Sequence, residues 1–323
     1  MAELRKNPFK NDWVMIASHR QNRPQMPKDW CPFCPGSGRV PEHFDVYKYD
    51  NDFPALSQTP PEPDDVASDF FETAPCYGKC EVILYSPEHT ITLPELSEEH
   101  VLKLVELWRE RFAALSDDKN IKYIMIFENR GELVGVTMPH PHGQIYGYGR
   151  IPKKCGDELF NSAAYHEKTG RCLHCDWLEN ERADGRRIIF EDEHFTCVLP
   201  FFSETVYGIQ LVARRHVNDI CQLTPDECVS LARAVRSAAG TLDSLFDERM
   251  PYMMFMHQAP VNSEGFDPMC SHFHVEFVPL LRSKGRQQFF ASSETGAWAH
   301  CNPTAPEEKA IELREAYKKF NSR

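Results

Sequence analysis

Hydrophobic residues recur at helical spacing in two long segments of the chain. In the segment after Ser97 they are Val101, Leu104, Val105, Trp108, Phe112 and Leu115. In the segment after Thr224-Pro225-Asp226-Glu227 they are Leu231, Val235, Ala238, Leu242 and Leu245. This spacing places the apolar side chains on one face of a helix, and the second segment opens with a capping box and a proline at the first helical position. The pattern predicts two amphipathic helices.

Short apolar runs that follow these helices predict strands at residues 123–127, 145–148 and 252–256, because they are rich in Ile, Met, Phe and Tyr. A third capping box, Thr304-Ala305-Pro306-Glu307, predicts a C-terminal helix that ends near Phe320. The proline-rich stretch 58–69 is expected to be a loop. Residues 150–170 are expected to connect two halves of the chain.

The pattern occurs twice in the same order: a histidine, a helix, an apolar strand and a His-x-His pair. The histidines are His89, His140 and His142 in the first half, and His216, His272 and His274 in the second. A chance repeat of four features in order is improbable, so the chain is interpreted as a duplication. The prediction is an α+β fold of two tandem halves, residues 1–150 and 151–323, each an antiparallel sheet with packed helices.

Composition narrows the class of function. The 323 residues carry a formal net charge of −12, which argues against nucleic acid or an anionic membrane as a partner. No apolar run approaches the roughly 18–20 residues that span a bilayer, and the N-terminus lacks the apolar core of a signal peptide. A cytoplasmic location is therefore expected, where the 12 cysteines are not expected to form structural disulfides.

Two Cys-x-x-Cys pairs precede the repeated histidines and predict metal sites. The first set is Cys31, Cys34, His89 and His140, and the second is Cys172, Cys175, His216 and His272. Two thiolates and two imidazoles suit tetrahedral zinc, and four protein ligands indicate a structural role for the ion. The alternative is that either pair is redox-active or incidental.

The segment from His140 to Gln144, His-Pro-His-Gly-Gln, carries the candidate chemistry. Residues 140, 142 and 144 share one face of a strand, because successive side chains alternate. A histidine beside a donor amide can attack phosphorus while the displaced charge is held by hydrogen bonds. A chance pair of histidines or a simple metal site is the alternative interpretation.

Together the motifs resemble the galactose-1-phosphate uridylyltransferase family, a nucleotidyltransferase branch of the histidine triad superfamily. Gln144 stands where the triad hydrolases have a third histidine. Further matching segments are Ser18–Pro24, Asn51-Asp52-Phe53, Ser86–His89 with Leu93–Ser97, and Phe127–Gly131. The resemblance extends over roughly residues 7 to 320, and the combination is far more specific than any single motif.

The resemblance implies that His142 attacks UDP-glucose, forms a uridylyl-histidine and passes the uridylyl group to galactose 1-phosphate in a ping-pong reaction. Gln144 cannot titrate, so it would hold a phosphoryl oxygen and leave the intermediate for a second phosphate. The implied substrate-binding residues are Arg20, Arg23, Asn51, Asp52, Phe53, Asn129 and Thr137. The resemblance also implies a homodimer, in which Arg20 and Arg23 reach the neighbouring site.

Two versions of the second metal site follow from the resemblance. Some uridylyltransferases have an iron site, whose ligands would match Glu158, His257, His272 and His274 here. Related nucleotide-sugar phosphorylases have a second Cys2His2 zinc site. The presence of Cys172 and Cys175 favours the zinc version.

The match is weaker where the sugar phosphate is expected to bind. Gln288-Phe289 stands where the family has lysine and phenylalanine, and Ser293 replaces a tyrosine before the sugar-binding Glu294. Two alternatives therefore stay open. One is a nucleotide-sugar phosphorylase that uses inorganic phosphate, with an ADP-sugar or another nucleotide sugar, and the other is a zinc-stabilised protein that binds nucleotides without turnover.

Overall fold

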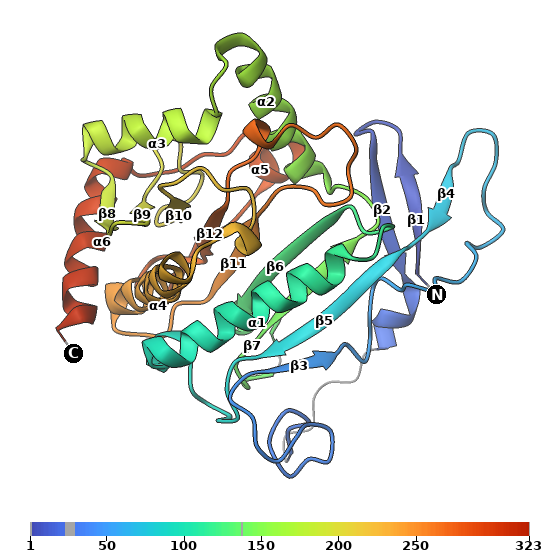
Figure 1. Cartoon of the computed structure of the whole chain (residues 1–323), viewed down its shortest axis with the longest axis horizontal. Coiled ribbons are helices and arrows are strands. Elements are labelled where there is room, and N and C mark those ends of the chain that lie inside the picture. The colour runs from blue at the N-terminus through green and yellow to red at the C-terminus, as the bar shows by residue number, and fades with distance from the viewer. Residues whose placement is uncertain (1, 23–29, 137, 323) are drawn as a thin grey trace.

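The computed structural model describes residues 2–22, 30–136 and 138–322, and its centre is one nine-stranded antiparallel sheet (Figure 1). In spatial order its strands are β3 (Tyr47–Asp50), β5 (Gly78–Leu84), β7 (His142–Tyr148), β6 (Tyr123–Arg130), β11 (Tyr252–His257), β12 (His274–Pro279), β10 (Ile209–Ala213), β9 (Phe195–Val198) and β8 (Ile188–Glu191). The two predicted halves share this sheet, because β6 of the first half pairs with β11 of the second.

The repeat predicted from the sequence is visible in the topology. The first half runs β5, α1 (Glu98–Ser116), β6 and β7, and the second runs β10, α4 (Pro225–Phe246), β11 and β12. The strand order β5-β7-β6 is mirrored by β11-β12-β10 across the centre of the sheet. The α+β prediction, with strand, helix, strand and strand in each half, is confirmed.

Helices α1 and α4 lie side by side over one face of the sheet (Figure 1). Their predicted apolar stripes face inward, and Trp108 and Leu231 are fully buried. The predicted capping box forms between Thr224 and Glu227, and in α1 the Ser97 side chain accepts a hydrogen bond from the His100 amide. The main core therefore lies between these helices and the sheet.

Smaller elements surround this core. They are α2 (Lys153–Thr169), α3 (Leu173–Asp184), α5 (Ser292–Ala297), α6 (Pro306–Asn321), a three-stranded sheet of β1 (Ala2–Asn7), β2 (Asp12–Ala17) and β4 (Thr73–Pro75), and a hairpin of β13 (Leu281–Ser283) and β14 (Arg286–Gln287). The connection expected at residues 150–170 is thus mostly helical. The C-terminal helix forms, but its predicted capping box is wrong: Ala305 occupies the N-cap, and the Thr304 hydroxyl donates to Asn302 Oδ1 at 2.8 Å.

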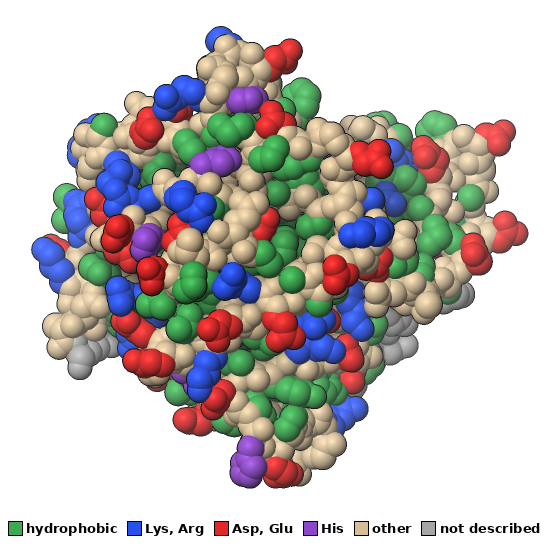
Figure 2. Space-filling view, in the orientation of Figure 1, with side chains coloured by type: hydrophobic (Ala, Val, Ile, Leu, Met, Phe, Trp, Pro, Cys, Tyr) green, Lys and Arg blue, Asp and Glu red, His purple; other side chains and the backbone are tan. Residues whose placement is uncertain are grey.

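The surface carries many charged side chains, as expected from the composition. Acidic and basic side chains are interspersed over the face in Figure 2. Within the described residues, no helix combines the length and apolarity needed to cross a membrane. None of the 12 cysteines is paired in a disulfide.

Candidate active site and metal sites

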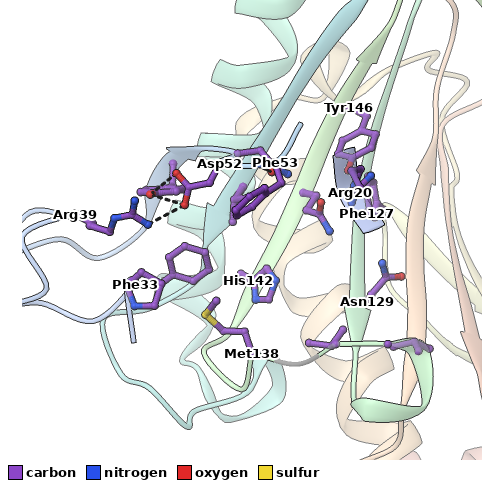
Figure 3. A pocket seen from close by; sticks show the side chains of 18 of the residues that line it. Arg20, Phe33, Arg39, Asp52, Phe53, Phe127, Asn129, Met138, His142 and Tyr146 are labelled. Atoms are coloured by element: carbon purple, nitrogen blue, oxygen red, sulfur yellow. Dashed lines mark hydrogen bonds and ion pairs between the residues drawn. The ribbon is translucent and has the colours of Figure 1, made fainter. Parts of the chain in front are cut away.

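A cleft of about 930 Å³ opens on the face of the sheet away from α1 and α4. Alternation along β7 creates it, because Ile145 is buried in the main core whereas the side chains of His142 and Gln144 line the cleft. The cleft also brings together five further residues predicted to bind substrate, namely Arg20, Asn51, Asp52, Phe53 and Asn129 (Figure 3). Sequence segments more than 100 residues apart thus meet around His142.

His142 is held in a defined orientation. Its Nδ1 lies 2.8 Å from the backbone oxygen of His140, so Nδ1 carries the proton and donates to that carbonyl. The ring also makes an edge-on contact with Phe33, with the ring centroids 5.7 Å apart. The orientation of His142 therefore depends on both His140 and the Cys31–Cys34 loop.

Aromatic side chains line much of the cleft, and a polar cluster around Asp52 lies at its rim. The Asp52 carboxylate accepts hydrogen bonds from Arg39 at 2.9 Å and from the Tyr49 hydroxyl at 3.0 and 3.1 Å (Figure 3). These contacts fix the Asp52 oxygens as acceptors at the rim. Sequence reasoning missed several lining residues, which are Trp30, Phe33, Arg39, Tyr49, Phe127 and Tyr146. Alternation on β3 and β6 from Asn51 and Asn129 could have indicated Tyr49 and Phe127.

Three predicted sugar-binding residues lie outside this cleft. Gln288 Oε1 accepts from the Val206 amide at 3.1 Å, Glu294 Oε2 accepts from the Ala291 amide at 2.9 Å, and Phe289 is 71% exposed. Two other predicted residues, Arg23 and Thr137, lie outside the described residues. Among the described residues, the cleft accordingly contains nucleotide-binding candidates and the candidate nucleophile His142, without the C-terminal candidates.

The first predicted metal set converges on one point. Cys34 Sγ lies 3.3 Å from His89 Nδ1 and 3.6 Å from His140 Nδ1, and Cys31 Sγ lies 3.7 Å from His140 Nδ1. Tetrahedral zinc with its usual bond lengths separates sulfur and nitrogen ligands by roughly 3.5 Å. His140 Nε2 is 2.8 Å from the Ser86 oxygen, which orients Nδ1 toward the thiols. Burial lowers the pKa of His140 to about 4, so this ring is a neutral ligand at pH 7.

The second set repeats this geometry. Cys175 Sγ lies 3.5 Å from His216 Nδ1 and 3.4 Å from His272 Nδ1, and Cys172 Sγ lies 3.8 Å from His272 Nδ1. His272 Nε2 is 2.7 Å from the Ala213 oxygen, as His140 is from Ser86. In each group the four ligand atoms lie within 4.8 Å of one another. Both donor sets fit zinc.

Comparison with known proteins places the chain in a family. Residues 1–152 match the model of the galactose-1-phosphate uridyl transferase N-terminal domain, and residues 158–297 match that of its C-terminal domain. The chain belongs to the galactose-1-phosphate uridylyltransferase family. This confirms the resemblance found in the sequence motifs.

Individual relatives of the uridylyltransferase family match over nearly the whole chain. The galactose-1-phosphate uridylyltransferase of Thermotoga maritima is 38% identical over 316 residues, 98% of each chain. The probable galactose-1-phosphate uridylyltransferase of Drosophila melanogaster is 30% identical, over 96% of this chain and 94% of its own. A solved uridylyltransferase structure superposes with a TM-score of 0.90 at 30% identity, covering 98% and 99% of the two chains. An ADP-glucose phosphorylase from Arabidopsis thaliana shares the fold, with a TM-score of 0.75 at 24% identity and 98% coverage of both chains.

The iron version of the second site loses one of its four expected ligands. His272 Nδ1 faces Cys172 and Cys175, so it belongs to the Cys2His2 group. The other expected ligands lie together: Glu158 Oε2 is 2.7 Å from His257 Nδ1, and Glu158 Oε1 is 4.0 Å from His274 Nε2. The structure therefore groups the ligands as the zinc version predicts, with these acidic and histidine side chains beside them.

Helix α2 covers the second half where the first half has its cleft. His274 and Glu276 hold the positions on β12 that His142 and Gln144 hold on β7. Lys154 of α2 pairs with Glu276 at 2.8 Å, while Glu158 of the same helix is directed at His257 and His274. Side chains of α2 thus occupy the approach to His274.

Proposed function

We propose that this protein is a UDP-glucose—hexose-1-phosphate uridylyltransferase with galactose 1-phosphate as acceptor. The observation that carries the proposal is His142 in the cleft, with Nδ1 committed to the His140 carbonyl and Gln144 on the same strand face. The names of relatives up to 38% identical over the full chain support the same reaction. The reaction makes the enzyme a nucleotidyltransferase.

In the proposed mechanism, His142 Nε2 attacks the α-phosphorus of UDP-glucose. A nitrogen–phosphorus bond forms and the bond to the oxygen of glucose 1-phosphate breaks, so the uridylyl group is transferred to histidine. An oxygen of galactose 1-phosphate then attacks the same phosphorus, forming UDP-galactose and freeing His142. The group displaced in the first step and the attacking group in the second are both sugar phosphates with a second pKa near ~6, so no strong general acid or base is needed.

Neighbouring side chains position the reaction. The Gln144 amide is proposed to donate to a phosphoryl oxygen, and Asn129 to bind the same group, with Thr137 and Arg23 as further candidates from the family resemblance. Arg20 lies in the cleft of its own chain and supplies positive charge there. Asn51, Asp52 and Phe53 are proposed to bind the uridine, with Asp52 oxygens accepting from hydroxyl groups. Rate enhancement would come mainly from positioning and charge stabilisation.

Both Cys2His2 sites are proposed to hold zinc in a structural role. The first would fix His140, and through its carbonyl the ring of His142; the second would join the start of α3 to the segment before β12. Four protein ligands leave no open position for substrate on either ion. Iron in the second half remains the alternative version, with Glu158, His257 and His274 as its donors.

A homodimer is proposed from the family resemblance. The exposed aromatic residues Phe202 and Phe290 line one groove in the second half and give a surface for such contact. In a dimer, the predicted sugar-binding residues Gln288, Phe289 and Glu294 would serve a cleft other than their own. A fully active monomer in light scattering would contradict this proposal.

Isotope exchange tests the ping-pong reaction. With UDP-glucose and labelled glucose 1-phosphate alone, label should enter UDP-glucose without any galactose 1-phosphate, and His142→Ala should abolish the exchange. Parallel assays with ADP-glucose and inorganic phosphate test the phosphorylase alternative. Exchange that needs the acceptor, or turnover confined to ADP-glucose, would contradict the proposal.

A further inference from the structure

The side of β7 that faces α1 leaves no room for a side chain between the two catalytic residues. A Cβ atom at Gly143 would lie 2.3 Å from the hydroxyl oxygen of Tyr85 and 3.0 Å from its Cζ atom. It would also lie 3.0 Å from the backbone oxygen of Phe127. Because Gly143 separates His142 from Gln144, the Tyr85 hydroxyl touches the backbone that carries both cleft side chains.

Burial, a ring contact and a backbone hydrogen bond hold Tyr85 in this position. It is 1% exposed, and its ring packs edge-on against Trp108 of α1 with centroids 6.1 Å apart. Its backbone amide donates to the Pro141 oxygen at 3.0 Å, which adds one bond beyond the end of the β5–β7 ladder. The phenol therefore cannot move away from β7 without disturbing α1 or the start of the catalytic strand.

A buried polar group lies beside the phenol. Glu128 is 5% exposed and accepts a hydrogen bond from the Tyr252 hydroxyl at 3.2 Å. After burial itself, Glu128 is the main cause that raises the pKa of Tyr85. Glu128 immediately precedes Asn129, whose side chain lines the cleft on the other face of β6. The polar residues Tyr85, Glu128 and Tyr252 thus stand behind both strands that carry the proposed phosphoryl-binding groups.

We propose that Tyr85 is a positioning residue for His142 and Gln144. The Tyr85 hydroxyl contacts β7 at Gly143, and this contact sets the distance between the strand and helix α1. That distance determines the direction in which the His142 ring and the Gln144 amide enter the cleft. The inference rests on the proposed function, because it assigns Tyr85 a part in the attack by His142.

The test is a double-variant cycle with Gly143→Ala and Tyr85→Phe. The added methyl group should collide with the Tyr85 hydroxyl and slow uridylyl transfer from UDP-glucose in a single turnover by about 100-fold, as a displacement of about 1 Å can. Tyr85→Phe removes the closest contact, so the double variant should recover about tenfold over Gly143→Ala. Recovery should be incomplete, because the Tyr85 Cζ and Phe127 oxygen contacts persist.

Gly147→Ala is the matched control on the same strand. Its Cβ would meet Ile121 Cδ1 at 2.8 Å, at the far end of a flexible side chain and away from Tyr85. Tyr85→Phe should therefore not rescue any defect of Gly147→Ala. Metal content and melting temperature of each variant would separate misfolding from mispositioning.

The rate at which diethyl pyrocarbonate modifies His142, read by peptide mass, gives a second measurement that needs no UDP-glucose turnover. The modification rate should change in Gly143→Ala, and adding Tyr85→Phe to that variant should reverse the change. This separates failure of the inference from failure of the proposed reaction. Strictly additive effects of the two substitutions, in both transfer and modification rates, would overturn the role of Tyr85.

Discussion

At the scale of single residues, the buried carboxyl of Glu128 has an unusual proton affinity. Burial raises the pKa of Glu128 from the ordinary value of 4.5 to about 7, despite the opposing charge of Arg130 and the hydrogen bond from Tyr252. Arg130 itself is paired with Asp243 at 2.6 and 2.8 Å. Because the folded protein holds this proton more tightly than the unfolded chain, Glu128 stabilises the fold most below its unfolded pKa.

Glu128→Gln should consequently change how stability depends on pH. In the parent, the contribution of Glu128 is lost as pH rises from about 4.5 through about 7, whereas glutamine does not titrate. The variant should gain roughly 2 kcal/mol relative to the parent between pH 5 and pH 9, from the cost per unit of pKa shift. Chemical denaturation across this range would measure it. Parallel stability curves for the two proteins would contradict the assignment.

At the scale of elements, the long helices were predictable because local signals and packing agree. Ser97 and Thr224 are good caps, and the apolar stripes that follow them are the surfaces buried against the sheet. Helix α2 was missed because its burial pattern is weak: only Cys155 and Ser162 are buried on it. Its contacts with the second half, such as the pair of Lys154 with Glu276, cannot be seen in the local sequence.

The candidate site likewise contains residues that could be predicted from the local sequence and residues that could not. His142, Gln144 and both metal sets could be predicted, because each rests on a short motif or a repeated order. Arg39 could not, since its contact with Asp52 forms only in the folded chain. The position of Gln288 also depends on tertiary contacts, with its side chain bonded to the Val206 amide. Motifs thus predicted which of these residues lie together, while the surrounding contacts required the fold.

The capping box of α4 gives an element-level prediction. Thr224→Ala removes the hydrogen bond that the Thr224 side chain accepts from the Glu227 amide and should destabilise the protein by about 1 kcal/mol, the usual cost of losing such a cap. Ser97→Ala is the corresponding change in α1 and should cost a similar amount, with the two effects additive because the caps are separate. Denaturant titration of the two single variants and the double variant would measure this. No loss in either single variant would show that packing alone determines where these helices begin.

At the scale of the whole molecule, the two halves share one sheet but differ in what approaches their histidines. In the first half a cleft reaches His142, whereas in the second Lys154 and Glu158 of α2 fill the equivalent approach. Each half nevertheless keeps a Cys2His2 group. The duplicated scaffold thus has a candidate metal site in each half and the candidate reaction cleft in one.

This difference predicts unequal effects of removing each metal site. Cys31→Ser should lower the zinc content by one ion per chain and slow uridylyl transfer strongly, because His140 orients His142. Cys172→Ser should also remove one ion and lower the melting temperature, yet leave the transfer rate of folded protein within a few-fold. Metal analysis, thermal melts and single-turnover assays on both variants would measure these effects. Equal losses of transfer rate would contradict the division of roles.

The most direct test of the central claim is the intact mass of the protein after mixing with UDP-glucose. We predict a gain of one uridylyl group, mapped to His142, absent in His142→Ala and lost when galactose 1-phosphate is added. A zinc-loaded protein that gains no mass with UDP-glucose, or an adduct located on another residue, would contradict the account.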